Sequence, residues 1–430
     1  MSRDQKRVAR WAVLALVWSA LAFAAAGCAG DDDEATSPPP AADTGALAPP
    51  PPAEPPPAEP PAEPPPSNPD VEAGAQAELG EGEGQVDVVV WAGYVEDGST
   101  DPAVDWVTYF EDTTGCQVNA TAGNTSDEMV TLMKTGNYDV VSASGDAALR
   151  LIAAEDVAPV NLDLIPNYAD VFPDLKDRPH NTVNGVHYGV PHGRVANLLM
   201  YRTDVVEPAP KSWAVVFDLN SPYKGKVTAY DSPNSVADAA VLLQSTKPEL
   251  GITDPYELDD AQFAAAIDLL KTQRTIVGEY WSDEATAISA FAGKKSVIGT
   301  TWQVILNRLV ADNVPVEAIL PKEGATGRSD TWMISSRAKH PNCAYMWLSH
   351  IISPEANAAV AEWIGEAPAN ALACALTTDP NHCTTYHADE TEYWEKVYYW
   401  KTPVADCGDG RGEVCKDYSA WVQAWTEIKG

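Results

Sequence analysis

The sequence predicts an α/β protein in which mixed, mostly parallel sheets, flanked by helices, are divided between two lobes. β-branched apolar runs alternate with amphipathic segments in the order strand, helix, strand, helix, strand, which is typical of a doubly wound parallel sheet. The first run, Gln85 to Tyr94, is predicted to be a buried interior strand, because valine dominates it and a Gly-rich segment precedes it. Residues 85–430 are enough for two lobes that each bury a core.

The remaining elements follow from the spacing of apolar residues and from local start signals. Thr125 and Glu128, for example, have the spacing of a capping box that opens a helix. Strands are expected at 116–121, 138–141, 196–201, 227–230, 297–300, 316–320 and 332–334, and helices at 102–114, 125–135, 236–244, 260–272, 283–292, 302–310, 342–351 and 354–363. Ligands of such sheets lie beyond the carboxyl ends of the strands. Trp91 and Tyr94, which close the first strand, are therefore candidate ligand contacts, with core packing as the alternative.

Residues 1–28 have the three parts of a lipoprotein signal peptide. A basic start is followed by an apolar run over 11–26 that is short for a spanning helix. The run ends in Ala25-Ala26-Gly27-Cys28, which resembles a bacterial lipobox, although Ala25 stands where leucine is commonest. The resemblance implies lipidation of Cys28, so that the mature chain would be held to a membrane through a lipid anchor only. An ordinary signal peptide followed by an unrelated cysteine is the alternative.

Residues 29–84 are predicted to be a disordered tether. They repeat Pro, Ala and Glu and contain almost no aromatic or branched apolar residues, so they cannot bury enough surface to fold. As extended polyproline II at about 3.1 Å per residue, the stretch from Pro38 to Pro69 would span about 100 Å. A stalk between the anchor and the folded domain is the expected role, and a ligand for a proline-binding module is the alternative.

Charge and cysteine content narrow the ligand and the compartment. With 28 basic and 62 acidic residues the formal net charge is −34, which argues against nucleic acid or an anionic membrane surface as partner and favours a cationic ligand. The cysteines that follow Cys28 are even in number, as expected in an oxidising, extracytoplasmic compartment. Many pairings are open to them, and close spacing favours Cys374 with Cys383 and Cys407 with Cys415, which leaves Cys116 with Cys343. None has the C-x-x-C spacing of a zinc site, and we expect no metal or other cofactor.

Short motifs occur in a specific order over residues 86–400. They are VVVWAGYV after the Gly-rich segment, GNYDVV at 136–141, YKGKV at 223–227, VIGTTW at 297–302, LPKEG at 320–324 and AEWIGEAPAN at 361–370. Together they resemble the extracytoplasmic solute-binding proteins of ABC importers, and most closely the spermidine/putrescine-binding group. The resemblance implies a two-lobed periplasmic-binding-protein fold, type II-like, whose cleft closes around one solute by hinge motion. Lobe 1 would comprise residues 85–194 and 321–366, and lobe 2 residues 195–320 and 367–430.

The family's ligand-binding positions carry over to this sequence as candidates. The positions at which the residue type matches are Trp91, Tyr94, Ser144, Asp231, Trp302 and Asp330. A protonated amine in a water-poor cleft needs a carboxylate, and aromatic faces add cation–π attraction of about 0.5 to 2 kcal/mol each. Asp231 and Asp330 would supply the charge and Trp302 an aromatic face, although each acid taken alone is expected on a solvated surface.

Four other positions depart from the family. Asp146 and Glu366 stand where tyrosines are usual, Asn234 where a glutamate is usual, and Arg328 near an expected tryptophan. Asp146 and Glu366 would add negative charge to the cleft and are kept as candidate ligand contacts. If Arg328 points into the cleft, it favours a zwitterion as the ligand, such as an amino acid, a guanidino acid or betaine.

The expected function is that of a monomeric receptor in the cell envelope that binds a polyamine or related organic cation and delivers it to an ABC permease. A ligand sensor on the same fold is an alternative, since its binding chemistry would be identical. An exported hydrolase is a remote alternative, because the sequence has no G-x-S-x-G, H-E-x-x-H or nucleotide-binding motif. The spacing of His187 and His192 fits neither a helix face nor a strand face, so we expect them in a crossing segment and not at a metal.

Overall fold

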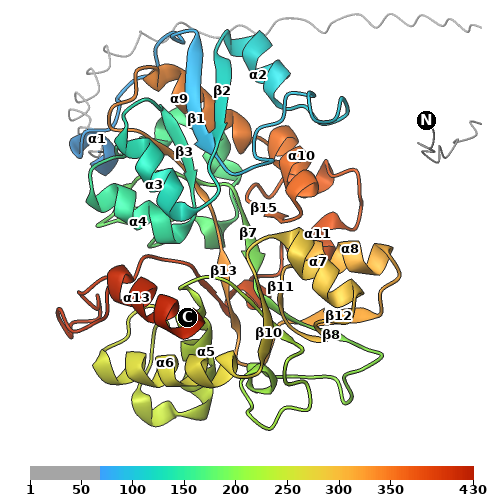
Figure 1. The fold of residues 1–430 in the computed structure, drawn as a ribbon. Helices are drawn as coiled ribbons and strands as arrows, with labels where there is room; N and C mark the ends of the chain where they lie inside the picture. The colour runs from blue at the N-terminus through green and yellow to red at the C-terminus, as the bar shows by residue number, and fades with distance from the viewer. Residues whose placement is uncertain (1–67) are drawn as a thin grey trace, which may run out of the picture. The chain divides into compact units, whose positions relative to one another are not determined.

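The computed structural model describes residues 68–430, all of which belong to one folded unit. The leader, Cys28 and the Pro-rich part of the expected tether lie outside the described residues. Within residues 68–430, no helix is both long enough and apolar enough to cross a bilayer. Figure 1 shows these residues arranged around two main sheets, with strands that run between them.

The first sheet has the strand order β2-β1-β3-β14-β6 and, with its helices, forms the first lobe. Its interior strand β1 (Gln85–Val90) runs parallel to β2 (Gln117–Ala122) and β3 (Val140–Ala143), whereas β14 (Thr331–Ile334) runs antiparallel to β3 and to β6 (Val190–Pro191). The helices of this lobe are α2 (Val107–Thr114), α3 (Ser126–Lys134), α4 (Gly145–Ala153), α9 (Pro341–Ile351) and α10 (Pro354–Ile364) (Figure 1). The prediction of an interior first strand is confirmed.

The second sheet has the order β10-β9-β11-β8-β12 and forms the second lobe. β9 (Val227–Tyr230), β10 (Val277–Trp281) and β11 (Ile298–Thr301) are parallel, and β8 (Leu198–Arg202) is antiparallel to β11 and to β12 (Val316–Ile319). The helices of this lobe are α5 (Ser235–Thr246), α6 (Asp260–Arg274), α7 (Glu284–Ala292), α8 (Gln303–Ala311) and α13 (Tyr418–Lys429) (Figure 1).

A four-stranded sheet of order β15-β7-β13-β16 lies between the two main sheets (Figure 1). β7 (Gly193–Ala196) continues from β6 of the first sheet into β8 of the second, and β13 (Ala325–Arg328) leads from β12 back to β14. These two strands pair antiparallel, and β15 (Ala367–Pro368) and β16 (Val397–Tyr399) flank them. The chain therefore crosses between the lobes on paired strands, which is the two-lobed fold that the sequence predicts. The residue limits of the lobes stay a proposal.

Each lobe has its own aromatic core. Phe110 and Trp347 are fully buried in the first lobe, with ring centroids 5.2 Å apart in an edge-to-face arrangement. Tyr256 and Trp421 are fully buried in the second lobe, with stacked rings 6.0 Å apart. Trp421 belongs to α13, so the C-terminal helix is part of the core of the second lobe.

Three disulfides are present, in the pairing that the spacing favours: Cys116 with Cys343, Cys374 with Cys383, and Cys407 with Cys415. The first of them joins the start of β2 to α9, with a Cα–Cα distance of 5.8 Å across a sequence separation of 227 residues. It therefore ties the early part of the first lobe to the part that the chain forms after its return from the second lobe.

The expected tether is shorter than predicted, because residues 68–84 contact the first lobe. Asn68 caps the short helix α1 (Pro69–Glu72), and the buried carboxylate of Asp70 accepts a hydrogen bond from the His187 backbone N–H. Further along, the Glu83 carboxylate accepts one from the Cys343 backbone N–H. Composition predicts disorder from the lack of apolar residues, and it misses acids that serve as hydrogen-bond acceptors for a folded neighbour.

Other elements differ from the sequence prediction in their bounds or were missed. α2 begins at Val107 and not at Pro102, because the Asp105 carboxylate accepts hydrogen bonds from the Val107 and Thr108 backbone N–H groups and so sets the start of the helix. The elements that the sequence analysis did not predict include α4, α13, β10, β13, the hairpin of β4 (Thr182–Val183) and β5 (Val186–His187), and the short helices α11 (His382–Thr385) and α12 (Thr391–Trp394).

Candidate functional site

Two candidate residues from different segments of the first lobe meet at the carboxylate of a third candidate, Asp330. Tyr94 follows β1, Ser144 follows β3, and Asp330 lies between β13 and β14. The Tyr94 hydroxyl donates to Asp330 Oδ2, and the Ser144 hydroxyl donates to Oδ1 at 2.6 Å. All three residues are buried. The convergence follows from the sheet, because β1 and β3 are parallel neighbours whose carboxyl ends lie at the same edge.

Arg328 places a positive charge in this cluster. Its Nη1 donates to Asp330 Oδ2 at 2.9 Å and to the Tyr94 hydroxyl at 2.8 Å. Its guanidinium carbon lies 5.4 Å from the centroid of a Trp302 ring, within range of a cation–π interaction. Burial opposes the charge, but the neighbouring Tyr94 and Asp330 raise the pKa of Arg328, so it stays protonated. Arg328 thus lies between residues of the two lobes, as the zwitterion alternative requires.

Trp302 brings the second lobe to the site. It precedes α8, and its indole N–H donates to Asn197 Oδ1 at 2.9 Å, which fixes the ring. Tyr230, the last residue of β9, lies 5.3 Å from Trp302 and is stacked on Trp400 at 5.9 Å between ring centroids. Burial raises the pKa of Tyr230 to about 12; the charge of Asp146 adds to this shift and that of Arg328 opposes it.

Tyr230 is a site residue that the sequence prediction missed. Its signal is its place at the carboxyl end of β9, the same position that made Trp91 and Tyr94 candidates after β1.

Glu366 and His192 form a buried pair next to Arg328. Burial raises the pKa of Glu366 to about 8, although Arg328 lowers it, and burial lowers the pKa of His192 to about 3. The Trp332 indole N–H donates to His192 Nδ1 at 2.8 Å, so the neutral ring carries its proton on Nε2. That Nε2 faces Glu366 Oε1 at 3.6 Å, and Glu366 Oε2 lies 3.8 Å from Arg328. At neutral pH the pair therefore adds little negative charge to the cluster.

Asp146 is a second buried carboxylate near the site. It lies in the first turn of α4 and is 5% exposed. The Ser126 hydroxyl donates to its Oδ1 at 3.0 Å. Burial raises the pKa of Asp146 to about 6, while the Ser126 hydrogen bond and the charge of Arg150 oppose the shift. The helix N-terminus also stabilises negative charge here, so Asp146 is mostly ionised at neutral pH.

Three sequence-selected residues do not join this cluster. Asp231 was expected to hold a ligand charge, but its carboxylate accepts hydrogen bonds from Trp425 Nε1 and Lys429 Nζ of α13. Lys429 therefore balances the charge of Asp231 in this structure, and a ligand contact of Asp231 stays a prediction. Trp91 packs against apolar residues of the first lobe. Asn234 is buried at the start of α5, and its Oδ1 has no hydrogen-bond partner in residues 68–430.

The C-terminal segment closes one side of the site. The Thr402 hydroxyl donates to the Asp146 backbone carbonyl at 2.6 Å, and the Arg150 guanidinium lies 4.7 Å from the Tyr418 ring centroid. Gly145 has to be glycine, because a Cβ there would lie 1.7 Å from the Trp400 carbonyl oxygen. This segment of the second lobe therefore touches α4 of the first lobe next to Asp146.

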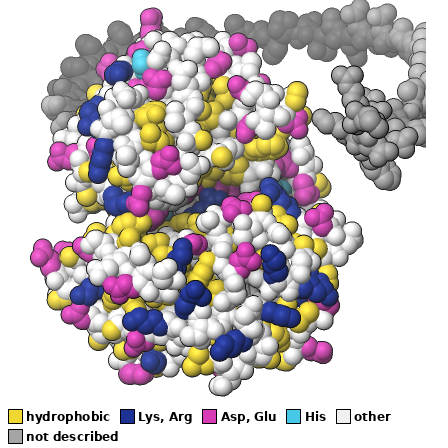
Figure 2. Space-filling model, viewed as in Figure 1, with side chains coloured by type: hydrophobic (Ala, Val, Ile, Leu, Met, Phe, Trp, Pro, Cys, Tyr) yellow, Lys and Arg dark blue, Asp and Glu magenta, His cyan; other side chains and the backbone are white. Residues whose placement is uncertain are grey.

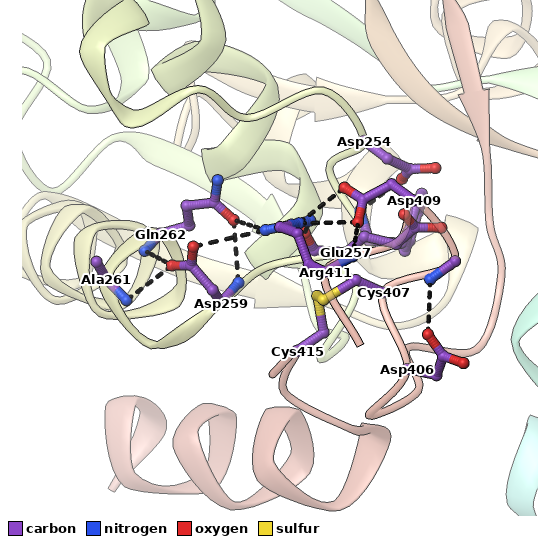
Figure 3. Close-up of a disulfide and its surroundings, with 12 residues drawn as sticks. Asp254, Glu257, Asp259, Ala261, Gln262, Asp406, Cys407, Asp409, Arg411 and Cys415 are labelled. Atoms are coloured by element: carbon purple, nitrogen blue, oxygen red, sulfur yellow. Dashed lines mark hydrogen bonds and ion pairs between the residues drawn. A yellow bond between two sulfur atoms is a disulfide. The ribbon is translucent and has the colours of Figure 1, made fainter. Parts of the chain in front are cut away.

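The disulfide loop of residues 407–415 fixes the C-terminal segment to the second lobe (Figure 3). Arg411 lies inside the loop and donates to Asp409 at 2.7 Å, to Gln262 Oε1 at 3.0 Å and to the Glu257 backbone carbonyl at 2.8 Å. Figure 3 shows these groups gathered around the guanidinium. A fork of N–H donors that reaches three acceptors holds the loop in one position against α6 and the loop before it.

Two lobes joined by paired crossing strands, with polar and aromatic groups that meet between them, define a two-lobed binding protein for a small solute. The chain belongs to the family of bacterial extracellular solute-binding proteins, whose model matches residues 105–382. Members of this family are the solute-binding components of ABC transporters, and it is not a family of enzymes.

Named relatives support the same assignment. The chain is 25% identical over 319 residues to the spermidine/putrescine-binding periplasmic protein of Escherichia coli K12, which covers 70% of this chain and 86% of the relative. It is 24% identical over 289 residues to the putrescine/cadaverine-binding protein of Pseudomonas aeruginosa, with 63% and 77% covered. A similar solved structure is the spermidine/putrescine ABC transporter substrate-binding protein of Streptococcus pneumoniae, with a TM-score of 0.62, 18% identity, and 80% and 97% covered.

The raised pKa of Glu366 predicts a pH dependence of stability. The folded protein keeps a proton on Glu366 up to about pH 8, whereas the unfolded chain releases it near the ordinary value of 4.5. The contribution of Glu366 to the free energy of unfolding therefore falls as the pH rises through this window. We expect the free energy of unfolding of Glu366→Gln, relative to that of wild type, to rise by at least about 1 kcal/mol from pH 5 to pH 9, measured by urea denaturation.

His192 and Asp146 titrate both in wild type and in the variant. The difference in the free energy of unfolding between the two proteins therefore isolates the effect of Glu366. Glu249→Gln, at an exposed glutamate of the second lobe, is the matched control and should give a difference that does not vary with pH. A constant difference for Glu366→Gln as well would show that Glu366 is ionised in the folded protein.

Proposed function

We propose that the protein is the receptor of an ABC importer and captures, between its lobes, a small solute that carries an ammonium group. The observation that carries the proposal is that the rings of Tyr230 and Trp302 lie 5.3 Å apart, and that the charge of the buried acid Asp146 acts on Tyr230. A carboxylate supplies the charge that a desolvated ammonium needs, and the rings add cation–π attraction. Figure 2 shows the hollow between the two lobes, with basic and acidic side chains along its edges.

Polyamines are the first ammonium compounds to consider, because they are the solutes for which the relatives are named. Those relatives are about a quarter identical to this chain, and the acid expected to grip an amine, Asp330, is paired with Arg328 here. We therefore propose the ammonium group itself, held near Asp146, as the common feature of the solute.

Binding would act through closure of the lobes. Trp302 and Tyr230 belong to the second lobe, whereas Asp146 and Asp330 belong to the first. A solute that contacts both sets binds the closed form more tightly than the open form, and this difference shifts the population toward closure. The crossing strands β7 and β13 are the place for the hinge, because they carry the chain between the main sheets. The closed form would then be presented to the permease.

We also propose that Cys28 carries a lipid anchor and that the Pro-rich tether holds the receptor outside the membrane. The three disulfides fit an extracytoplasmic location, since structural disulfides persist in oxidising compartments. Cys28→Ser should move the protein from the washed membrane fraction to the soluble fraction, measured by immunoblot of both fractions. Membrane retention of this variant would contradict the anchor.

Titration calorimetry tests the proposed function. The full chain, unfolded and refolded to remove bound solute, is titrated with spermidine, putrescine, arginine, 5-aminovalerate and glycine betaine, and with glucose as an uncharged control. At least one ammonium compound should bind with a micromolar or lower dissociation constant, and glucose should not bind. Asp146→Asn should weaken that binding at least tenfold, about 1.4 kcal/mol, because the ammonium loses its charge partner.

Asp112→Asn is the matched control. Asp112 is exposed on α2, and its substitution removes one negative charge, as Asp146→Asn does. It should leave the dissociation constant unchanged. Equal weakening by the two variants would show that Asp146 acts through net charge alone. Absence of binding by every ammonium compound would overturn the proposed function.

A further inference from the structure

The carboxylate of Asp330 already accepts three hydrogen bonds from the protein. Oδ1 accepts from the Ser144 hydroxyl, and Oδ2 accepts both from the Tyr94 hydroxyl and from Arg328 Nη1. Asp330 is 2% exposed, so water does not compete for these positions. A ligand ammonium at Oδ2 would have to displace Arg328, and removal of that partner would leave a buried carboxylate without its counter-charge. The cation that this acid binds is therefore part of the protein itself.

Arg328 keeps hydrogen-bonding capacity of its own. Its side-chain hydrogen bonds use Nη1 alone, and its Nε and Nη2 make no hydrogen bond to any residue of 68–430. Its side chain is 17% exposed, and Nε and Nη2 are not among the fully buried side-chain nitrogens of residues 68–430 that lack a partner. A guanidinium presents its donors as a planar fork that matches a carboxylate.

The charges around Arg328 leave it without a second anion. Asp330 balances its charge, and Glu366, the other acid within 4 Å, stands at 3.8 Å and has a pKa raised to about 8 by burial. A second cation beside Arg328 would be repelled, since like charges a few ångströms apart repel strongly where little water screens them. An anion there would instead meet free donors and an aromatic wall, Trp302.

We propose that the solute carries a carboxylate in addition to its ammonium group, and that Arg328 selects it by binding that carboxylate. The inference rests on the proposed function, in which the ammonium group lies near Asp146. The ligand class is then an amino acid whose two charged groups lie at opposite ends of a short apolar chain. The apolar chain of the solute would pack against Tyr230 and Trp302, whose rings lie 5.3 Å apart and next to the Arg328 guanidinium.

A matched series of five-carbon compounds tests the proposal on the full, unmodified chain. Cadaverine has an ammonium group at both ends, 5-aminovalerate has one ammonium and one carboxylate, and glutarate has two carboxylates. The three have the same chain length and differ in their end groups alone. Four-carbon and six-carbon sets of the same design allow for a cleft of different length. In one of these sets, the affinity measured by calorimetry should be at least tenfold higher for the aminocarboxylate than for the diamine and the dicarboxylate.

Arg328→Gln should lower the affinity for the preferred aminocarboxylate at least tenfold and leave diamine binding equal or stronger. Arg328→Lys keeps the positive charge but loses the planar set of N–H donors. Its affinity for the aminocarboxylate should lie between those of Arg328→Gln and wild type. Arg308→Gln is the matched control, because Arg308 is 54% exposed on α8 and pairs with Glu284; it should change neither affinity. Thermal unfolding of each variant shows whether it is folded, and the wild-type series needs no variant.

The outcomes separate this inference from the function on which it rests. Tighter binding of the diamine than of the aminocarboxylate by wild type would overturn the role of Arg328 and leave an ammonium receptor in place. Tightest binding of the dicarboxylate would overturn the ammonium site. Absence of binding throughout the three sets would overturn the inference, and the amines of the calorimetric panel would then decide the proposed function separately.

Discussion

The site depends on the need of one buried carboxylate, Asp330, for hydrogen-bond donors. An ionised acid taken out of water is costly unless it is paired and hydrogen-bonded, often by several kcal/mol. Asp330 finds its donors in three segments: Tyr94 after β1, Ser144 after β3, and Arg328 two residues before it. These bonds hold the loops at the carboxyl edge of the first sheet in one arrangement. The first-lobe side of the cleft is therefore preorganised before any solute arrives.

The same cluster explains how the two lobes come into contact. The guanidinium that neutralises Asp330 also lies over Trp302 of the second lobe, so one residue links the charge network to the aromatic wall. On the other side, the C-terminal segment contacts α4 through Thr402 and Tyr418. Its Lys429 donates a hydrogen bond to the Asp231 carboxylate. That segment lies beyond residue 382, where the match to the family model ends. The region past the family match thus contributes to the walls of the cleft.

Much of the fold follows from local sequence, and the site follows from it in part. Apolar spacing places most strands and helices, and the parallel order of β1 and β3 explains why Tyr94 and Ser144 lie near each other. The partners of charged groups are set by residues that are distant in sequence. Lys429 lies 198 residues from Asp231, and no local pattern predicts that pair. The orientation of Arg328 is likewise fixed by Tyr94 and Asp330 together, which is why the sequence leaves the charge of the ligand open.

A crystal structure of the protein with 5-aminovalerate, or with its four-carbon or six-carbon analogue, tests the central claim most directly. We predict a carboxylate within hydrogen-bond distance of the free N–H groups of Arg328, an ammonium group at Asp146, and an intact bond between Arg328 and Asp330. A solute ammonium bound to Asp330, with Arg328 turned away from the Tyr94 hydroxyl, would contradict the account.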